Sequence, residues 1–169
     1  MFTPPAPGAA ISRGAVVYGL NPSIFAARYA RRTYGSEALA MWSPMRDPDH
    51  LRVEYGGREM VKTIVPFVYK GQLIETTSWI CRDFVPINAA DRSISVGLYS
   101  TEKDKGRYPT DAGMQRIGEL RVDVPEGLGD KIIVVEMNYS GPVIQVRAFP
   151  KLKPDMKANV TINLGPDHK

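Results

Sequence analysis

Residues 131–149 read KIIVVEMNYSGPVIQVRAF, and this stretch decides the fold class. The segment from Lys131 to Met137 is almost continuously apolar and is expected to form a strand. The segment from Pro142 to Phe149 alternates apolar and polar residues, as in a half-buried strand whose successive side chains point to opposite faces. Between them, residues 138–141 read NYSG, with a glycine available for positive φ. Residues 131–149 are therefore expected to form a β-hairpin.

Three further segments show the same alternation, with their apolar residues on one face. These residues are Ile94, Val96 and Leu98 in 93–98, Leu120, Val122 and Val124 in 119–124, and Val160, Ile162 and Leu164 in 158–164. Short alternating segments separated by Gly, Pro, Asn and Asp argue for an antiparallel sandwich. The expected fold class is therefore mainly β, an antiparallel β-sandwich with a short N-terminal helical segment.

The first part of the chain has a different character. Residues 1–10 are rich in Pro and Ala and lack the features of a secretory signal, so a disordered leader is expected. Arg13 to Leu20 suits a closely packed helix, and the following Asn21–Pro22 either ends that helix or caps a second one that runs to about Arg31. The segment from Tyr29 to Met41 fits a helix and a strand equally.

The composition of the 169 residues argues against several classes of protein. Apolar residues make up 43% and charged residues 24%, near the average for soluble globular domains. No apolar run is long enough to span a membrane. The net charge of +4 is mild and the basic residues are scattered among acids, which argues against nucleic-acid binding. The single cysteine, Cys81, cannot form an internal disulfide, so a reducing, cytoplasmic location is expected.

The sequence contains no clear motif for catalysis or metal binding. His50 and His168 lie far from Cys81 and in no metal-ligand spacing. Gly127–Gly129 follows a proline and is expected to be a turn, because it is too short for a nucleotide-binding fingerprint. Carboxylates such as Glu54, Glu59, Asp104 and Asp111 are expected to be solvated surface acids. These residues predict a mostly β domain that is not an enzyme.

Two regions of the chain resemble the 70-kDa heat-shock protein family. Residues 13–19, RGAVVYG, resemble the GA-x-x-x-G helix near the end of that family's ATPase domain, where small residues let the helix approach the bound adenosine. The longer stretch 13–35, RGAVVYGLNPSIFAARYARRTYG, is similar to the divergent branch numbered twelve. In that branch a basic segment ending in TYG replaces the usual acidic-hydrophobic linker, and residues 31–35 resemble this segment.

The second region is longer. Residues 84–98, FVPINAADRSISVGL, are similar to the family's strand, loop and strand around the peptide site. Residues 133–149 are similar to its closing hairpin, and residues 160–162 to its final strand. Further similar segments are 67–74, 99–103 and 117–124. The order and spacing of these segments carry the resemblance, which covers roughly residues 11–164.

This resemblance implies a domain organisation. Residues 11–32 would be a remnant of the C-terminal end of an actin-like ATPase domain, with Gly14, Ala15 and Gly19 on the adenosine-side helix. Residues 33–164 would be the peptide-binding β-sandwich, and residues 165–169 a tail. The full-length family uses ATP and Mg²⁺. Both phosphate-binding loops and the catalytic carboxylates are missing from this sequence, so no cofactor is expected in this chain.

The family's members are stress-response chaperones. The resemblance therefore implies that the sandwich binds extended apolar peptide segments or a protein partner, and that the parent protein's ATPase domain is a further partner. By position, the peptide site would consist of Leu39, Met41, Phe84, Ile87, Ile94 and Val96.

The residues themselves leave other interpretations open. Ile94 and Val96 alternate as core residues do, whereas Ile87 follows Pro86 in a turn-like stretch where a core role is harder to explain. One alternative is a protein–protein interaction domain of the same fold without general peptide binding. Another is an unrelated β-sandwich enzyme acting on glycans, which would need two carboxylates facing each other in a cleft.

Overall fold

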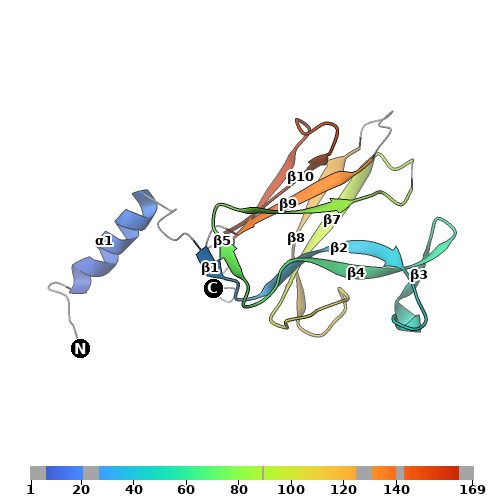
Figure 1. The fold of residues 1–169 in the computed structure, drawn as a ribbon, viewed down its shortest axis with the longest axis horizontal. Coiled ribbons are helices and arrows are strands. Elements are labelled where there is room, and N and C mark those ends of the chain that lie inside the picture. The colour runs from blue at the N-terminus through green and yellow to red at the C-terminus, as the bar shows by residue number, and fades with distance from the viewer. Residues whose placement is uncertain (1–6, 21–26, 89, 125–130, 140–142, 164–169) are drawn as a thin grey trace.

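The computed structural model describes residues 7–20, 27–88, 90–124, 131–139 and 143–163. Within these residues the fold is mainly β, with antiparallel sheets and a single α-helix, which confirms the predicted fold class (Figure 1). In chain order the elements are α1 (Pro7–Leu20), β1 (Ala27–Tyr29), β2 (Thr33–Met41), the 3-10 helix η2 (Asp49–Leu51), β3 (Arg52–Tyr55), β4 (Arg58–Val68), β5 (Leu73–Glu75), β6 (Trp79–Phe84), β7 (Ser93–Thr101), β8 (Met114–Asp123), β9 (Ile133–Tyr139), β10 (Val143–Pro150) and β11 (Ala158–Asn163).

Two sheets pack face to face as a β-sandwich. One sheet has the strand order β3-β4-β2-β7-β8, and the other has the order β11-β10-β9-β6. A small separate ladder pairs β1 with β5. In Figure 1 the orange and red strands of the second sheet lie above the blue and green strands of the first. The predicted hairpin is present, since β9 and β10 pair antiparallel from Tyr139↔Ile144 to Pro150↔Ile133. Asn138 and Tyr139, which were expected in the turn, belong to β9, and residues 140–142 lie outside the described residues.

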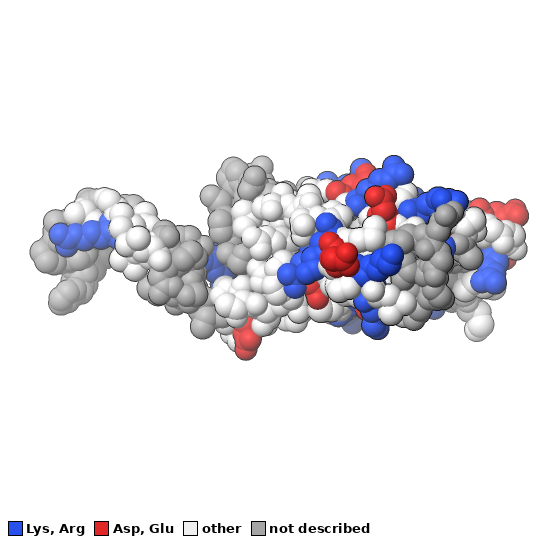
Figure 2. All heavy atoms as spheres, turned by 90° about the horizontal axis from the view of Figure 1, so that it is seen from above, with Lys and Arg blue, Asp and Glu red and all other residues white. Residues whose placement is uncertain are grey.

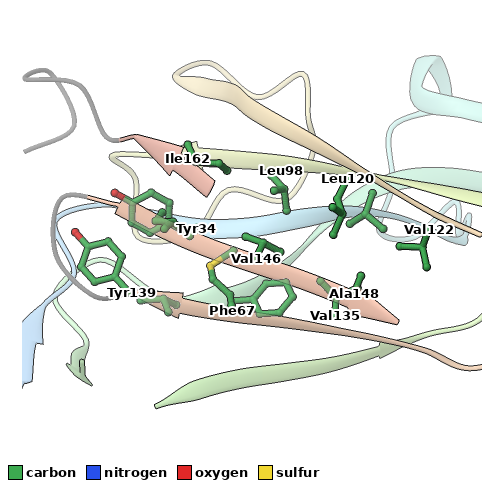
Figure 3. Close-up of a cluster of buried hydrophobic side chains, with 14 of the residues drawn as sticks. Tyr34, Phe67, Leu98, Leu120, Val122, Val135, Tyr139, Val146, Ala148 and Ile162 are labelled. Atoms are coloured by element: carbon green, nitrogen blue, oxygen red, sulfur yellow. The ribbon is translucent and has the colours of Figure 1, made fainter. Parts of the chain in front are cut away.

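The hydrophobic core fills the space between the two sheets. The alternating faces predicted from the sequence supply much of it, and Figure 3 shows these side chains pointing toward one another. Buried members drawn there include Leu98, Leu120, Val122, Val135, Val146 and Ala148. Ile162 of β11 is buried as expected, whereas Leu164 lies outside the described residues.

The N-terminal expectations need correction. Helix α1 begins at Pro7, so residues 7–10, which were expected to lie in a disordered leader, are helical. The expected close packing of this helix is wrong, because Val16, Val17 and Leu20 are exposed and α1 stands apart from the strands in Figure 1. The alternative expectation, a second helix that runs to about Arg31, is wrong for its last residues, because residues 27–29 form strand β1. The ambiguous segment before Met41 is the strand β2.

The segment just before β2 packs with the sandwich. Ala30 is buried in the core cluster, and Arg32 is buried with its guanidinium against Glu102 at 3.0 Å and Gln115 at 3.0 Å. Residues 27–32, which the resemblance assigned to an ATPase remnant, therefore contact the β domain directly. The expected boundary between residues 32 and 33 falls inside this packed segment.

Candidate functional site

Strands β2 and β7 pair over only part of their length. Thr33–Ser36 is hydrogen-bonded to Leu98–Thr101, but the ladder between the two described strands stops there. Beyond this point Glu37–Met41 continues against β4, and Ser93–Gly97 continues against β8. The two strands therefore part in the middle of their sheet, and their divergence is visible in Figure 1.

Irregularities in both strands accompany this parting. A bulge between Tyr34 and Gly35 interrupts the β2–β4 ladder, and bulges bend the strand that carries them. At Gly35 a Cβ would lie 2.6 Å from a methyl carbon of Ile64, so the close approach of β2 to β4 requires glycine. A second register shift interrupts the β7–β8 ladder between Leu98 and Tyr99. Both irregularities lie near the point where the β2–β7 ladder ends.

A groove of about 450 Å³ opens where the strands part, within the size range of ligand sites. It is bounded by β2 and β4 on one side, by β7 on the other, and by the end of β6 with the β6–β7 connection. The groove enters between the two sheets, because it reaches residues of both. Its apolar lining includes Leu39, Val65, Phe84, Val85, Ile87 and Ile94.

Most of the site residues implied by the resemblance meet in this groove. Leu39, Phe84, Ile87, Ile94 and Val96 all line it. Val96 is also a core residue, at 3% exposure, and Phe84 and Ile94 pack against the same core. Met41 does not line the groove; it is exposed at the end of β2, where it pairs with Met60. A peptide-binding role for any of them stays a prediction.

Sequence reasoning missed several lining residues, above all Tyr55, Val65 and Arg82. Tyr55 ends β3, and a two-residue turn of Gly56 and Gly57, both at positive φ, returns the chain into β4. That Gly-Gly pair was the available signal for a hairpin bordering the site. Arg82 lies two residues before Phe84, so the alternation of a strand was its available signal. Val65 had no comparable signal, since it reaches the groove only through the pairing of β4 with β2.

Three carboxylates line the groove, those of Glu37, Asp83 and Asp91. The Glu37 carboxylate forms an ion pair with Lys62 at 2.9 Å and accepts a hydrogen bond from the Tyr99 hydroxyl at 2.9 Å. Asp83 pairs with Lys151 at 3.0 Å. On the face seen in Figure 2, basic and acidic side chains likewise stand beside one another. Lysines thus balance the carboxylates of Glu37 and Asp83, whereas Asp91 accepts a hydrogen bond from the neutral Tyr55 hydroxyl.

A polar cluster ties together the two loops on the outer side of β4. The Asp47 carboxylate is buried and accepts hydrogen bonds from Arg107, from the Tyr108 hydroxyl and from the Ser43 amide at 2.9–3.0 Å. Burial of Asp47 acts to raise its pKa, but hydrogen bonds from Arg46, Tyr108 and Arg107 together hold that pKa well below its usual range. The cluster therefore contains an ionised carboxylate that joins loop 42–51 to loop 102–113.

Other candidate chemistry is limited. Within the described ranges, no group of three or more His, Cys, Asp or Glu residues could hold a metal ion. Cys81 is exposed, and its burial-related desolvation and the nearby Glu136 raise the pKa of its thiol, which keeps it in the less nucleophilic protonated form. Gly14 and Ala15 lie on the exposed helix α1, and their implied position near adenosine stays a prediction. The described part of the chain has no helix of the length and apolarity that a membrane crossing requires.

The fold and the groove define the class: an antiparallel β-sandwich with an apolar opening between two parted strands. No protein-family model matches the chain. Over 118 residues it is 29% identical to heat shock 70 kDa protein 12A of Homo sapiens and of Mus musculus, and 28% identical to heat shock 70 kDa protein 12B of Homo sapiens.

The matched residues make up 69% of this chain, but only 18% of protein 12A and 17% of protein 12B. The chain therefore spans less than a fifth of the length of these curated relatives. The similarity supports a distant relationship to the 70-kDa heat-shock proteins.

Proposed function

We propose that this chain is the peptide-binding module of a chaperone-like protein and holds extended apolar segments in the groove between β2 and β7. The groove is the observation that carries the proposal: it is open, mostly apolar and lined by Leu39, Phe84 and Ile87. The distant similarity to heat shock 70 kDa proteins 12A and 12B supports a chaperone-like role. On this proposal the chain is the C-terminal, substrate-binding part of its parent protein.

The parted strands suit an extended peptide backbone. Between Glu37–Met41 and Ser93–Gly97 no ladder of described residues uses the facing backbone N–H and C=O groups. A peptide strand is able to hydrogen-bond to such groups while its alternate side chains enter a pocket. One buried Leu-sized side chain contributes about 1.5–3 kcal/mol, and each backbone hydrogen bond about 0.5–1.5 kcal/mol. After the cost of ordering the peptide, a dissociation constant on the order of micromolar follows.

On this proposal the module holds peptides without ATP hydrolysis of its own, because its sequence has neither phosphate-binding loop. We also propose a cytoplasmic location, on the ground that its single cysteine is an exposed free thiol.

One observation favours a second function, a dedicated interaction domain with a single protein partner. The Tyr55 hydroxyl donates a hydrogen bond to Asp91 at 3.3 Å, and both residues line the groove. On this second proposal, the contact hinders the entry of peptides of arbitrary sequence. A dedicated domain would bind its partner but not a generic apolar peptide.

The test is an NMR titration of the isotope-labelled chain with an unlabelled heptapeptide that has leucine at its centre. Peptide binding in the groove should shift the methyl signals of Leu39, Ile87 and Ile94 together in a saturable way. The exposed methyl groups of Leu152, which lies outside the groove lining, should not move. If no signal moves up to about 1 mM peptide, the chaperone-module proposal fails and the dedicated-partner proposal replaces it.

A further inference from the structure

The groove contains a cation on a face where an apolar side chain would be expected. Every second side chain of strand β6 faces the core, since Ile80 and Phe84 both pack against the core cluster. Arg82 lies between them with the same orientation, opposite the fully buried Val135 of β9, and it is half-buried. Arg82 also lines the groove. A basic residue thus lines the groove at a position where the alternation of β6 faces the core.

Backbone contacts hold the Arg82 guanidinium in a defined place. Its Nε donates to the carbonyl of Pro66 at 3.2 Å, and its Nη1 donates to the carbonyl of Cys81 at 2.8 Å. Its Cζ lies 5.7 Å from the centre of the Phe67 ring. A guanidinium has five N–H donors, so these two bonds leave further donors for a ligand.

Arg82 has no acidic partner among the residues that the structure describes. Glu37 and Asp83 in the same groove, in contrast, each form an ion pair with a lysine. A charge that is partly removed from water is normally balanced by an opposite charge. The neighbouring carboxylate, Asp83, pairs with Lys151. A ligand carboxylate would supply the missing partner.

We propose that Arg82 makes the groove selective for extended peptides that carry a carboxylate two residues away from their apolar anchor. The inference rests on the proposed function, because it concerns the ligand of the same groove. The spacing follows from strand geometry: residues two apart on one face of an extended chain are about 7 Å apart. Phe84 and Arg82 are likewise two residues apart on one face of β6. A peptide running along that strand would therefore present its apolar side chain to Phe84 and its acidic side chain to Arg82.

The experiment compares three capped heptapeptides with a central leucine. They differ only at two positions, two residues before and two residues after that leucine. Both positions carry Glu in the first peptide, Gln in the second and Lys in the third. The wild-type chain should bind the Glu peptide about tenfold more tightly than the Gln peptide, as one charge-assisted contact allows, and the Lys peptide most weakly. Fluorescence anisotropy at low and high salt measures each dissociation constant.

Two variants assign the preference to Arg82. Arg82→Gln should bind the Glu and Gln peptides equally, whereas Arg82→Lys, which keeps a charge without the guanidinium fork, should keep part of the preference. Arg121→Gln is the matched control, since Arg121 is exposed on β8, hydrogen-bonds to Ser93 and does not line the groove. It should keep the full preference.

The outcomes separate the inference from the proposed function. Equal binding of the Glu and Gln peptides by the wild-type chain overturns the inference alone, as does a Glu preference that survives in Arg82→Gln. If none of the three peptides binds, the proposed function fails and the inference fails with it. If Arg82→Gln does not fold, the inference is still tested by the preference of the wild type for the Glu peptide over the Gln peptide and by the partial loss of that preference in Arg82→Lys.

Discussion

Tyr55 and Asp91 join two sides of the groove. The Tyr55 hydroxyl, at the end of β3, donates to Oδ2 of Asp91 in the β6–β7 connection at 3.3 Å, and both residues line the opening. The negative charge of Asp91 raises the pKa of Tyr55, so the phenol is a protonated donor at neutral pH. A peptide seated in the groove would have to leave past this contact or break it.

Tyr55→Phe should therefore speed peptide release. The hydrogen bond is exposed and worth at most about 1 kcal/mol, so dissociation should be a few-fold faster while the melting temperature hardly changes. Stopped-flow displacement of a labelled peptide measures the rate. Tyr69→Phe removes a hydroxyl from another exposed tyrosine, away from the groove lining, and should have no effect. Equal release rates in Tyr55→Phe and wild type would show that the bridge does not retain the peptide.

The pKa of Asp47 predicts how stability depends on pH. Because this pKa is lower in the folded chain than in the unfolded chain, Asp47 stabilises the fold at neutral pH, and its contribution is lost as the pH falls below about 4. Asp47→Asn should therefore melt at a lower temperature than wild type at pH 7, and the difference should shrink toward about pH 3.

Thermal melts across that pH range provide the measurement. Asp104→Asn, an exposed position on loop 102–113, serves as the control and should change the melting temperature little. A deficit in Asp47→Asn that stays constant down to acidic pH would show that ionisation of Asp47 does not stabilise the fold.

Val135→Asp should prevent folding. Val135 is fully buried at the centre of β9, between β6 and β10. A carboxylate there would lose its hydration and would have only the half-buried Arg82 of β6 opposite it, and the cost of removing two charges from water commonly exceeds the gain from pairing them. Circular dichroism and solubility of the expressed protein measure the outcome. Gln145→Asp, at an exposed position on the adjacent strand β10, should fold normally. A soluble Val135→Asp protein that melts cooperatively would contradict a central role for β9.

Mg-ATP should not bind to this chain, because its sequence contains neither phosphate-binding loop of the heat-shock ATPase. Calorimetric titration should give only the heat of dilution. A saturable binding curve with a dissociation constant on the order of micromolar would contradict this expectation.

The strands that could be predicted from sequence are those with one buried face. β7, β8 and β10 alternate along their length, and the structure buries the expected residues, such as Val96, Val122 and Val146. The strands β2 and β4 escaped prediction because both of their faces are partly covered. In β4, for example, Val61 on one face and Met60 on the other are both buried, which hides the period of two.

The groove illustrates the same limit. Residues around Phe84 and Ile87 lie close together in sequence, so a resemblance over one segment named them together. Tyr55 and Val65 reach the groove from the separate strands β3 and β4, and only the tertiary fold brings them near Ile87. Met41 follows Leu39 by two residues in β2 but does not line the groove, and its place in the peptide site stays a prediction.

The proposal that the groove binds extended apolar peptides depends most on Ile87. This side chain is half-buried in the groove and does not belong to the core cluster, so a charge there can stay hydrated in the free protein. Ile87→Asp should therefore melt near the wild-type temperature, but it would force an apolar ligand to desolvate a carboxylate. Leu152→Asp, at an exposed apolar position that does not line the groove, is the matched control.

The decisive measurement is fluorescence anisotropy of a labelled, leucine-centred heptapeptide with wild type, Ile87→Asp and Leu152→Asp, alongside their thermal melts. Wild type and Leu152→Asp should bind with a dissociation constant on the order of micromolar, and Ile87→Asp should bind at least about tenfold more weakly while remaining folded. Absence of binding by the folded wild-type chain up to about 1 mM peptide would contradict the proposed function. Unchanged binding by a folded Ile87→Asp would show that the peptide site lies elsewhere.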